Sequence, residues 1–219
     1  MRALTRPALV LGTFLLSAVA VAQASAQDGP GHNHIGHVAD GFRGTPEGAG
    51  LLPTAMMEAE VALQHATLAA SGDADLAGMK RHAGHVLHAL DASTSERGPG
   101  KGFGLIRALD ASVQHIEMAA GTDGASDGVK THTNHVASAA RSASERAQRM
   151  KRLAMRIMES DDQAMAATAA GQLKDLAEQV LAGHDANGDD RTGWGDGEGG
   201  IEQAAMHLGL MKRGEGMGG

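Results

Sequence analysis

The 219-residue sequence has no cysteine and no tyrosine, and it has only three phenylalanines and one tryptophan. The absence of cysteine excludes disulfides, thiolate metal sites, cysteine nucleophiles and covalently attached c-type haem. With so few aromatic residues, any core must be built from Ala, Leu, Val, Ile and Met, whereas sheets draw on β-branched and aromatic residues. Long stretches are rich in Ala, Leu, Met, Lys, Arg, Gln and Glu, which favour helices. The composition predicts an all-α protein and leaves twelve histidines to explain.

Residues 1–26 have the three parts of a signal peptide. Arg2 and Arg6 make the first part positive, residues 8–21 are apolar, and residues 24–26 read Ala-Ser-Ala, which fits the cleavage rule. The apolar run is too short for a convincing transmembrane span. We therefore expect cleavage after residue 26, secretion across the inner membrane, most simply into a periplasm, and no membrane insertion afterwards.

The charge balance argues against nucleic-acid binding. The formal net charge is −7, and losing the two arginines of the leader makes the exported chain more acidic. Nucleic-acid binding needs a clustered basic surface. The one basic cluster, residues 141–156, is interleaved with Glu145 and is typical of the solvated side of a helix.

The apolar pattern divides the rest of the chain into helices. Residues 27–50 are rich in Gly and His with almost no apolar periodicity, so we expect a flexible tail that is either exposed or docks late onto the rest of the fold. Helical periodicity predicts helices at about 53–70, 73–91 (with Asp73 as N-cap), 103–120, 129–159, 161–181 and 201–211. No repeat with a fixed period is apparent. We predict an antiparallel helical bundle of four to five main helices over residues 51–160, a helix-loop-helix appendage over 161–211, and a flexible C-terminus over 212–219.

The loop between the last two predicted helices is rich in oxygen ligands. Residues 185–196 read D-A-N-G-D-D-R-T-G-W-G-D, and in this helix-loop-helix setting they resemble the EF-hand family. The resemblance implies a calcium site with side-chain ligands from Asp185, Asn187, Asp189 and Asp196, and a main-chain carbonyl from Arg191.

Three positions of this loop depart from the family pattern. Asp190 replaces the glycine of the sharp turn, Thr192 replaces an apolar residue, and Asp196 replaces the bidentate glutamate. These changes imply weaker binding or altered geometry, and Glu198 can take the place of Asp196 if the loop is stretched. The alternative is an acidic linker that binds nothing.

Two sets of histidines are candidate transition-metal ligands. His32, His34 and His37 lie in the predicted tail, where three imidazoles can bind copper, nickel or zinc. The alternative is a chance cluster on a solvated segment. In the predicted bundle, side chains from four helices are placed where they can meet at one site: Glu58, His65, His82, His85, His115, His132 and His135.

The helical spacing supports this bundle site. Glu58 and His65 share one side of their helix, and His132 and His135 are neighbours one turn apart. His85 and His115 are each flanked by small residues, which is typical of a closely packed seam. The alternative for each residue is a surface or hydrogen-bonded core histidine.

These observations favour a non-enzymatic, exported metal-binding protein. The ion is copper, zinc or iron in one version, and two imidazoles hold a b-type haem for electron transfer in another. A third version is a structural or interaction module that is only stabilised by calcium. The Glu-x-x-His pairs of di-iron bundles are absent, as are the G-x-S-x-G, Walker and H-E-x-x-H motifs. Partners other than metal ions are not indicated, and an open metal site with enzymatic activity is the least favoured version.

Overall fold

The computed structural model describes residues 30–94, 97–195 and 197–218. Within these ranges the chain forms no β-strand, only one isolated bridge between Gly41 and Ala49. The predicted signal peptide and Asp196 lie outside the described residues. The α-helices are α1 (Pro30–Ala39), α2 (Leu51–Ala69), α3 (Leu76–Leu90), α4 (Leu105–Ala120), α5 (Asp127–Glu159), α6 (Gln163–Ala182) and α7 (Ile201–Gly214). The all-α prediction is therefore confirmed.

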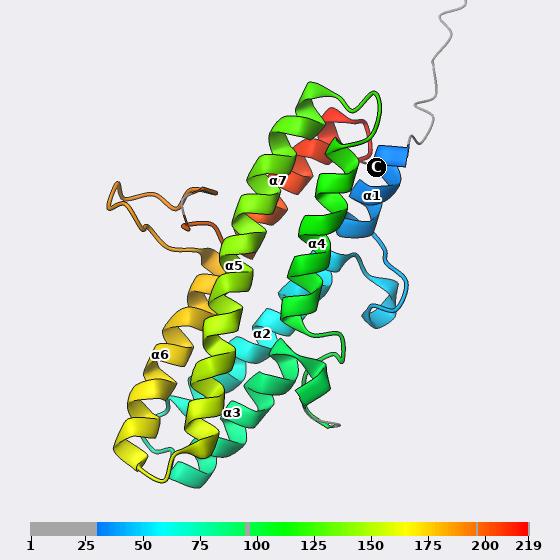
Figure 1. Ribbon diagram of the computed structural model, residues 1–219. Coiled ribbons are helices and arrows are strands. Elements are labelled where there is room, and N and C mark those ends of the chain that lie inside the picture. The colour runs from blue at the N-terminus through cyan, green and yellow to red at the C-terminus, as the bar shows by residue number, and fades with distance from the viewer. Residues whose placement is uncertain (1–29, 95–96, 196, 219) are drawn as a thin grey trace, which may run out of the picture.

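The 33-residue helix α5 runs along the whole elongated bundle and packs against α3, α4, α6 and α7. Towards one end of the molecule it lies with α1, α4 and α7, and towards the other with α2, α3 and α6 (Figure 1). Helix α2 also contacts α4, which joins the two ends. None of the described helices is long and apolar enough to span a membrane.

Side-chain caps fix the starts of three helices. The Asp75 carboxylate accepts a hydrogen bond from the Gly78 N–H at 2.7 Å, and the Ser126 hydroxyl accepts one from the Val129 N–H at 3.0 Å. Asp162 caps α6 in the same way. The predicted N-cap Asp73 is wrong by two residues, because Asp75 is the residue placed to accept the N–H of the third helical residue.

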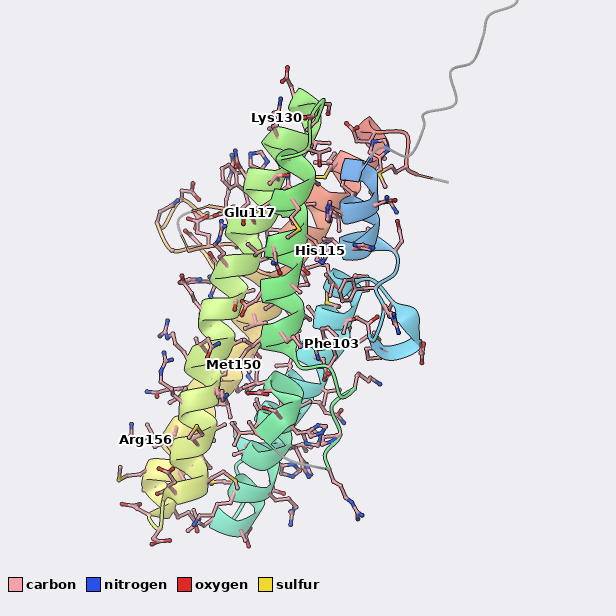
Figure 2. All side chains as sticks on the ribbon, turned by 45° about the vertical axis from the view of Figure 1, so that its right-hand side comes forward. Phe103, His115, Glu117, Lys130, Met150 and Arg156 are labelled. Atoms are coloured by element: carbon pink, nitrogen blue, oxygen red, sulfur yellow. The ribbon has the colours of Figure 1, made fainter. Side chains whose placement is uncertain are left out.

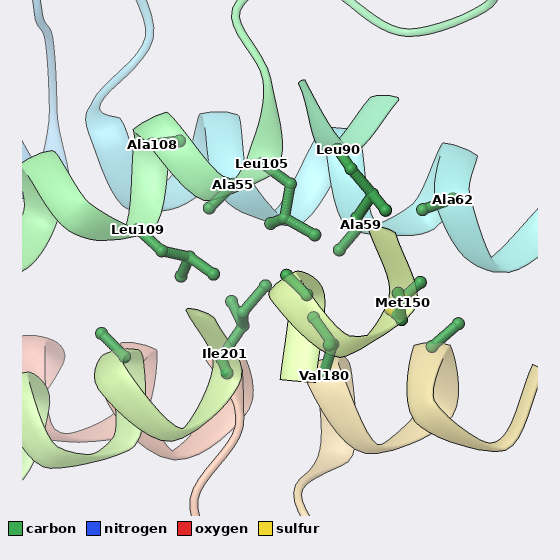
Figure 3. Packing of buried hydrophobic residues seen from close by; sticks show 14 of the residues in the cluster. Ala55, Ala59, Ala62, Leu90, Leu105, Ala108, Leu109, Met150, Val180 and Ile201 are labelled. Carbon is green, nitrogen blue, oxygen red and sulfur yellow. The ribbon is translucent and has the colours of Figure 1, made fainter. Parts of the chain in front are cut away.

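The core is built from small side chains, as the shortage of aromatic residues predicts. Ala55, Ala59, Ala62, Ala66 and Ala69 form one buried face of α2. Figure 3 shows that several of them face larger residues of other helices, including Leu90, Leu105, Leu109, Met150, Val180 and Ile201. Alanine faces let helix axes approach closely, so these helices gain dispersion contacts without large side chains.

The predicted flexible tail is wrong for residues 30–50. This segment contains α1, and its Ile35 and Val38 are fully buried in the core. Two apolar residues three positions apart are enough to dock a ten-residue helix, but they are too few to give a recognisable period. The predicted flexible C-terminus is also partly wrong, because α7 continues to Gly214 and Met217 packs against the core.

Candidate metal centres

Nine histidines form three groups in which the ligand nitrogens all lie within 4.8 Å of one another. Site 1 consists of His34, His37 and His115; site 2 of His65, His82 and His85; site 3 of His132, His135 and His207. Most of these side chains are partly buried, and no histidine belongs to two groups. Among the described residues, only histidines make up these groups, without a carboxylate.

All three sites have the same construction. One helix supplies two histidines three residues apart, which puts both on the same face, and a neighbouring helix supplies a third, here called the central histidine. The pairs lie on α1, α3 and α5, and the central histidines His115, His65 and His207 lie on α4, α2 and α7. Figure 2 shows His115 on the side of α4 next to α1.

In each site the central histidine lies between the other two, with its Nδ1 atom close to both of theirs. In site 1 the Nδ1 atoms of His34 and His37 lie 3.0 and 3.4 Å from that of His115. In site 2 the distances from His65 are 3.1 Å to His82 and 3.4 Å to His85. In site 3 the distances from the central histidine are 3.3 and 3.2 Å.

Hydrogen bonds alone do not satisfy three converging imidazole nitrogens. A neutral imidazole nitrogen has either one hydrogen or one lone pair, so the central Nδ1 can make one good hydrogen bond but has two Nδ1 neighbours. A metal ion removes this conflict, because it accepts all three lone pairs. Nitrogens bound at about 2.0–2.1 Å in tetrahedral geometry lie about 3.3–3.4 Å apart, and the separations of 3.0–3.4 Å from the central Nδ1 are close to this value.

The surroundings of the sites favour the neutral form of six of the nine imidazoles. Burial, followed by the nearby His85 and His82, lowers the pKa of His65 to about 4. Burial is also the main cause of the lowered pKa of His82, His85, His115, His135 and His207, with neighbouring histidines or Arg81 adding to it. Only the neutral imidazole has a free lone pair, so these side chains are ready to bind metal at neutral pH.

Aromatic rings cover two of the sites. The Phe42 ring packs against His37 and His115 of site 1, with centroids 5.5 and 5.2 Å away. Trp194 stacks on His135 of site 3, with centroids 3.9 Å apart and planes inclined by 27°. Because Trp194 is the chain's single tryptophan, its fluorescence reports on site 3.

The predicted ligands therefore come together in a different combination. The six helical histidines of the one predicted bundle site belong to three sites, and His34 and His37 of the predicted tail site complete the first of them. The third tail residue, His32, instead pairs with Glu215 at 3.0 Å. His207 was not predicted as a ligand.

Glu58 is not at any of these sites. Its fully buried carboxylate accepts hydrogen bonds from the N–H groups of Lys101, Phe103 and Gly104 at 2.9–3.0 Å. Its place on the same helix side as His65 suggested a shared ion, but it lies almost two turns away and holds the loop before α4. His88 also holds this loop, since its Nδ1 accepts the Gly100 N–H at 3.1 Å.

An internal repeat, missed in the sequence, would have revealed the common construction. Residues 61–90 align without gaps with residues 111–140, and the alignment superimposes Gln64-His65 on Gln114-His115 and both histidine pairs. The motif His-x-x-His-Val occurs three times, at residues 34–38, 82–86 and 132–136. The two aligned segments form the hairpins α2–α3 and α4–α5. The three histidines of the first hairpin form one site together. Those of the second hairpin are divided between two sites, one shared with α1 and the other with α7.

The 185–198 loop folds around its own carboxylates. Asp185 accepts hydrogen bonds from the N–H groups of Gly188, Asp189 and Asp190, and the side chains of Asn187 and Asp189 each accept one more. The buried side chain of Arg146 donates to the carbonyl oxygens of Gly197, Glu198 and Gly199, and contacts His184 Nδ1 at 2.8 Å. This arginine fixes the end of the loop to α5.

No known family model matches this chain, and neither the curated proteins nor the solved structures include a significant match. The fold and the three histidine groups define it as an all-helical protein whose histidine triads can hold metal ions.

Proposed function

We propose that this protein binds transition-metal ions, with one ion at each of its three histidine sites. The observation that carries the proposal is the threefold recurrence of one ligand arrangement on three different pairs of helices. A single cluster of three histidines can arise from packing alone. Three clusters that share the i, i+3 pair, the central histidine and the facing Nδ1 atoms point to selection for ligand geometry.

A metal ion accounts for this geometry better than haem. Two axial imidazoles of a b-type haem bind on opposite faces of a flat macrocycle. Here three nitrogens converge on one point from two neighbouring helices, with separations of 3.0–3.4 Å from the central nitrogen. Imidazole is a good ligand for copper, zinc, iron and nickel. The three ligands leave further coordination positions for solvent or an exchange partner.

The proposal predicts that three ions bind per chain. The test is equilibrium dialysis of the purified, metal-free protein against Cu⁺, Cu²⁺ and Zn²⁺ in separate experiments, followed by elemental analysis. We expect at least one of these ions to reach three equivalents, and its binding at site 3 to change the Trp194 fluorescence. If no ion binds above the level of a similarly acidic protein without histidine clusters, the proposal is wrong.

We further propose that the chain works after export, because the first 26 residues have the composition of a signal peptide. Expression in a Gram-negative host, fractionation and N-terminal sequencing test this directly. The expected product is periplasmic and begins at residue 27, whereas an uncleaved cytoplasmic product would contradict it.

A second candidate function is calcium binding by the 185–198 loop. Glu198 is 5% exposed, and its Oε1 atom has no hydrogen-bond partner among the described residues. Its Oε2 atom accepts the Gly193 N–H within the same loop at 2.7 Å. A buried carboxylate oxygen without a partner is costly, and a hard cation bound at this end of the loop would satisfy it. Glu198 is thus a better candidate than Asp196 for the last ligand.

Calcium is expected to raise the melting temperature of the protein by about 3–8 °C at millimolar concentration, because the ion binds only the folded loop. Glu198→Gln, which keeps the side-chain shape, is expected to lose most of this increase. Glu202→Gln, at an exposed position in α7, is the matched control and keeps it. Equal melting curves of the unmodified protein with and without calcium would contradict the site.

A further inference from the structure

The charge around the three sites limits which ion they can hold. Every ligand is an imidazole, which carries no negative charge, and cysteine, whose thiolate would supply negative charge, is absent from the chain. The acidic residues close in sequence to site 1 are paired elsewhere. Glu117 forms an ion pair with Arg141 on α5, and Asp40 forms one with Lys212 on α7.

A positive side chain at site 2 and aromatic rings at sites 1 and 3 also disfavour an ion of high charge. At site 2, Arg81 lies next to His82 and is among the charges that act on both His82 and His85. At sites 1 and 3, Phe42 and Trp194 lie against the ligand rings and restrict the room for water on that side. An ion at site 1 therefore gains no compensation from Glu117 or Asp40, and the rings at sites 1 and 3 reduce contact of the ion with solvent on one side.

These conditions penalise a divalent ion far more than a monovalent one. The Born cost of moving an ion out of water rises with the square of its charge, so a divalent ion costs about four times as much as a monovalent ion of equal size. Repulsion from Arg81 doubles with the charge of the ion. A divalent ion therefore needs an additional bound anion, whereas a monovalent ion does not.

Resting on the proposed function, we propose that each histidine site binds one Cu⁺ ion through three imidazole nitrogens. Cu⁺ is a monovalent d¹⁰ ion that accepts imidazole ligands and has no ligand-field preference to enforce a fourth ligand. In each site the central Nδ1 lies 3.0–3.4 Å from both partner Nδ1 atoms, which suits nitrogens that bind one ion. The protein then holds three Cu⁺ ions without sulfur ligands from cysteine.

The test compares Cu⁺ with Zn²⁺, because both ions are d¹⁰ and differ chiefly in charge. Full-length exported protein is titrated with each ion under anaerobic conditions at neutral pH, in competition with a chromophoric chelator of known affinity. We expect three equivalents of Cu⁺ with an affinity at least about 100-fold higher than that for Zn²⁺. X-ray absorption of the Cu⁺ form is expected to show nitrogen scatterers at about 2.0 Å.

Removing the charge of Arg81 tests independently whether nearby positive charge weakens binding of a divalent ion more than that of a monovalent ion. In a His115→Ala/His207→Ala background, where only site 2 keeps three ligands, Arg81→Gln is expected to raise the affinity for Zn²⁺ by about the square of the factor for Cu⁺. Arg107→Gln, on α4 and stacked over Phe103, is the control and leaves both affinities unchanged.

The outcomes separate the two proposals. If Zn²⁺ binds as tightly as Cu⁺, or if Arg81→Gln changes both affinities equally, the assignment of Cu⁺ is wrong while the metal-binding function stands. If neither ion binds in a histidine-dependent way, both proposals are wrong.

Discussion

Replacing the three central histidines with alanine, in the variant His65→Ala/His115→Ala/His207→Ala, is expected to abolish high-affinity metal binding. Each central Nδ1 lies within 3.4 Å of both partners, so its loss leaves two ligands that share one helix face and no third ligand across the interface. We expect the affinity of every site to fall by at least about 100-fold. Elemental analysis after dialysis measures the loss of three equivalents.

Single variants are expected to assign the sites one at a time. Each single substitution should remove one equivalent, but only His207→Ala should also remove the metal-dependent change in Trp194 fluorescence, because Trp194 stacks on His135 of that site. His32→Ala is the matched control, since this histidine pairs with Glu215 outside the three groups. Far-ultraviolet circular dichroism verifies that each variant is folded. Three equivalents retained in the triple variant would show that the ions bind elsewhere.

The helical part of the fold could be predicted because its signals are local. Composition and apolar spacing identified α2 to α7 within a few residues, since most of the core is formed by regular stripes such as the alanines of α2. Helix α1 was missed because only Ile35 and Val38 are deeply buried in it. Its stability comes from docking onto α4 and α2, which is a property of the assembled fold.

The ligands were easier to predict than their grouping. The i, i+3 pairs at residues 82–85 and 132–135 lie on one helix and are visible in the sequence, whereas the choice of central histidine depends on which helices are neighbours. His115 is close to His132 along the chain, yet it completes a site with His34 and His37, because α1 packs beside α4. The two aligned hairpins show that the same histidine spacing does not fix the partner.

The prediction of Glu58 as a metal ligand was wrong for a physical reason. A carboxylate on the same stripe as a histidine resembles a ligand pair, but the three N–H groups that it binds lie in a Gly-rich loop more than forty residues away in the sequence. Most of this loop lies between the helices predicted at 73–91 and 103–120. Nothing in the local pattern indicates that it turns back over α2 and fills the space beside Glu58.

Glu58→Ala is therefore expected to lower the free energy of unfolding by about 2–6 kcal/mol, because it leaves three N–H groups of the loop without partners, two of them buried. The substitution also acts on α4. Its N-cap, Gly104, has no side-chain cap, and the Glu58 carboxylate binds the N–H groups immediately before its first turn, where the helix dipole favours negative charge. Urea unfolding followed by circular dichroism measures the change.

Two further variants separate this role from a general effect on α2. Glu58→Gln keeps the size and one acceptor oxygen but loses the charge, so we expect a smaller loss of about 1–3 kcal/mol. Glu60→Ala, at an exposed position on the same helix, is expected to change stability by less than about 0.5 kcal/mol. Hydrogen exchange of residues 101–104 should accelerate in Glu58→Ala before the rest of the bundle opens. A Glu58→Ala protein as stable as Glu60→Ala would mean that solvent satisfies this loop and that the carboxylate is free for another use.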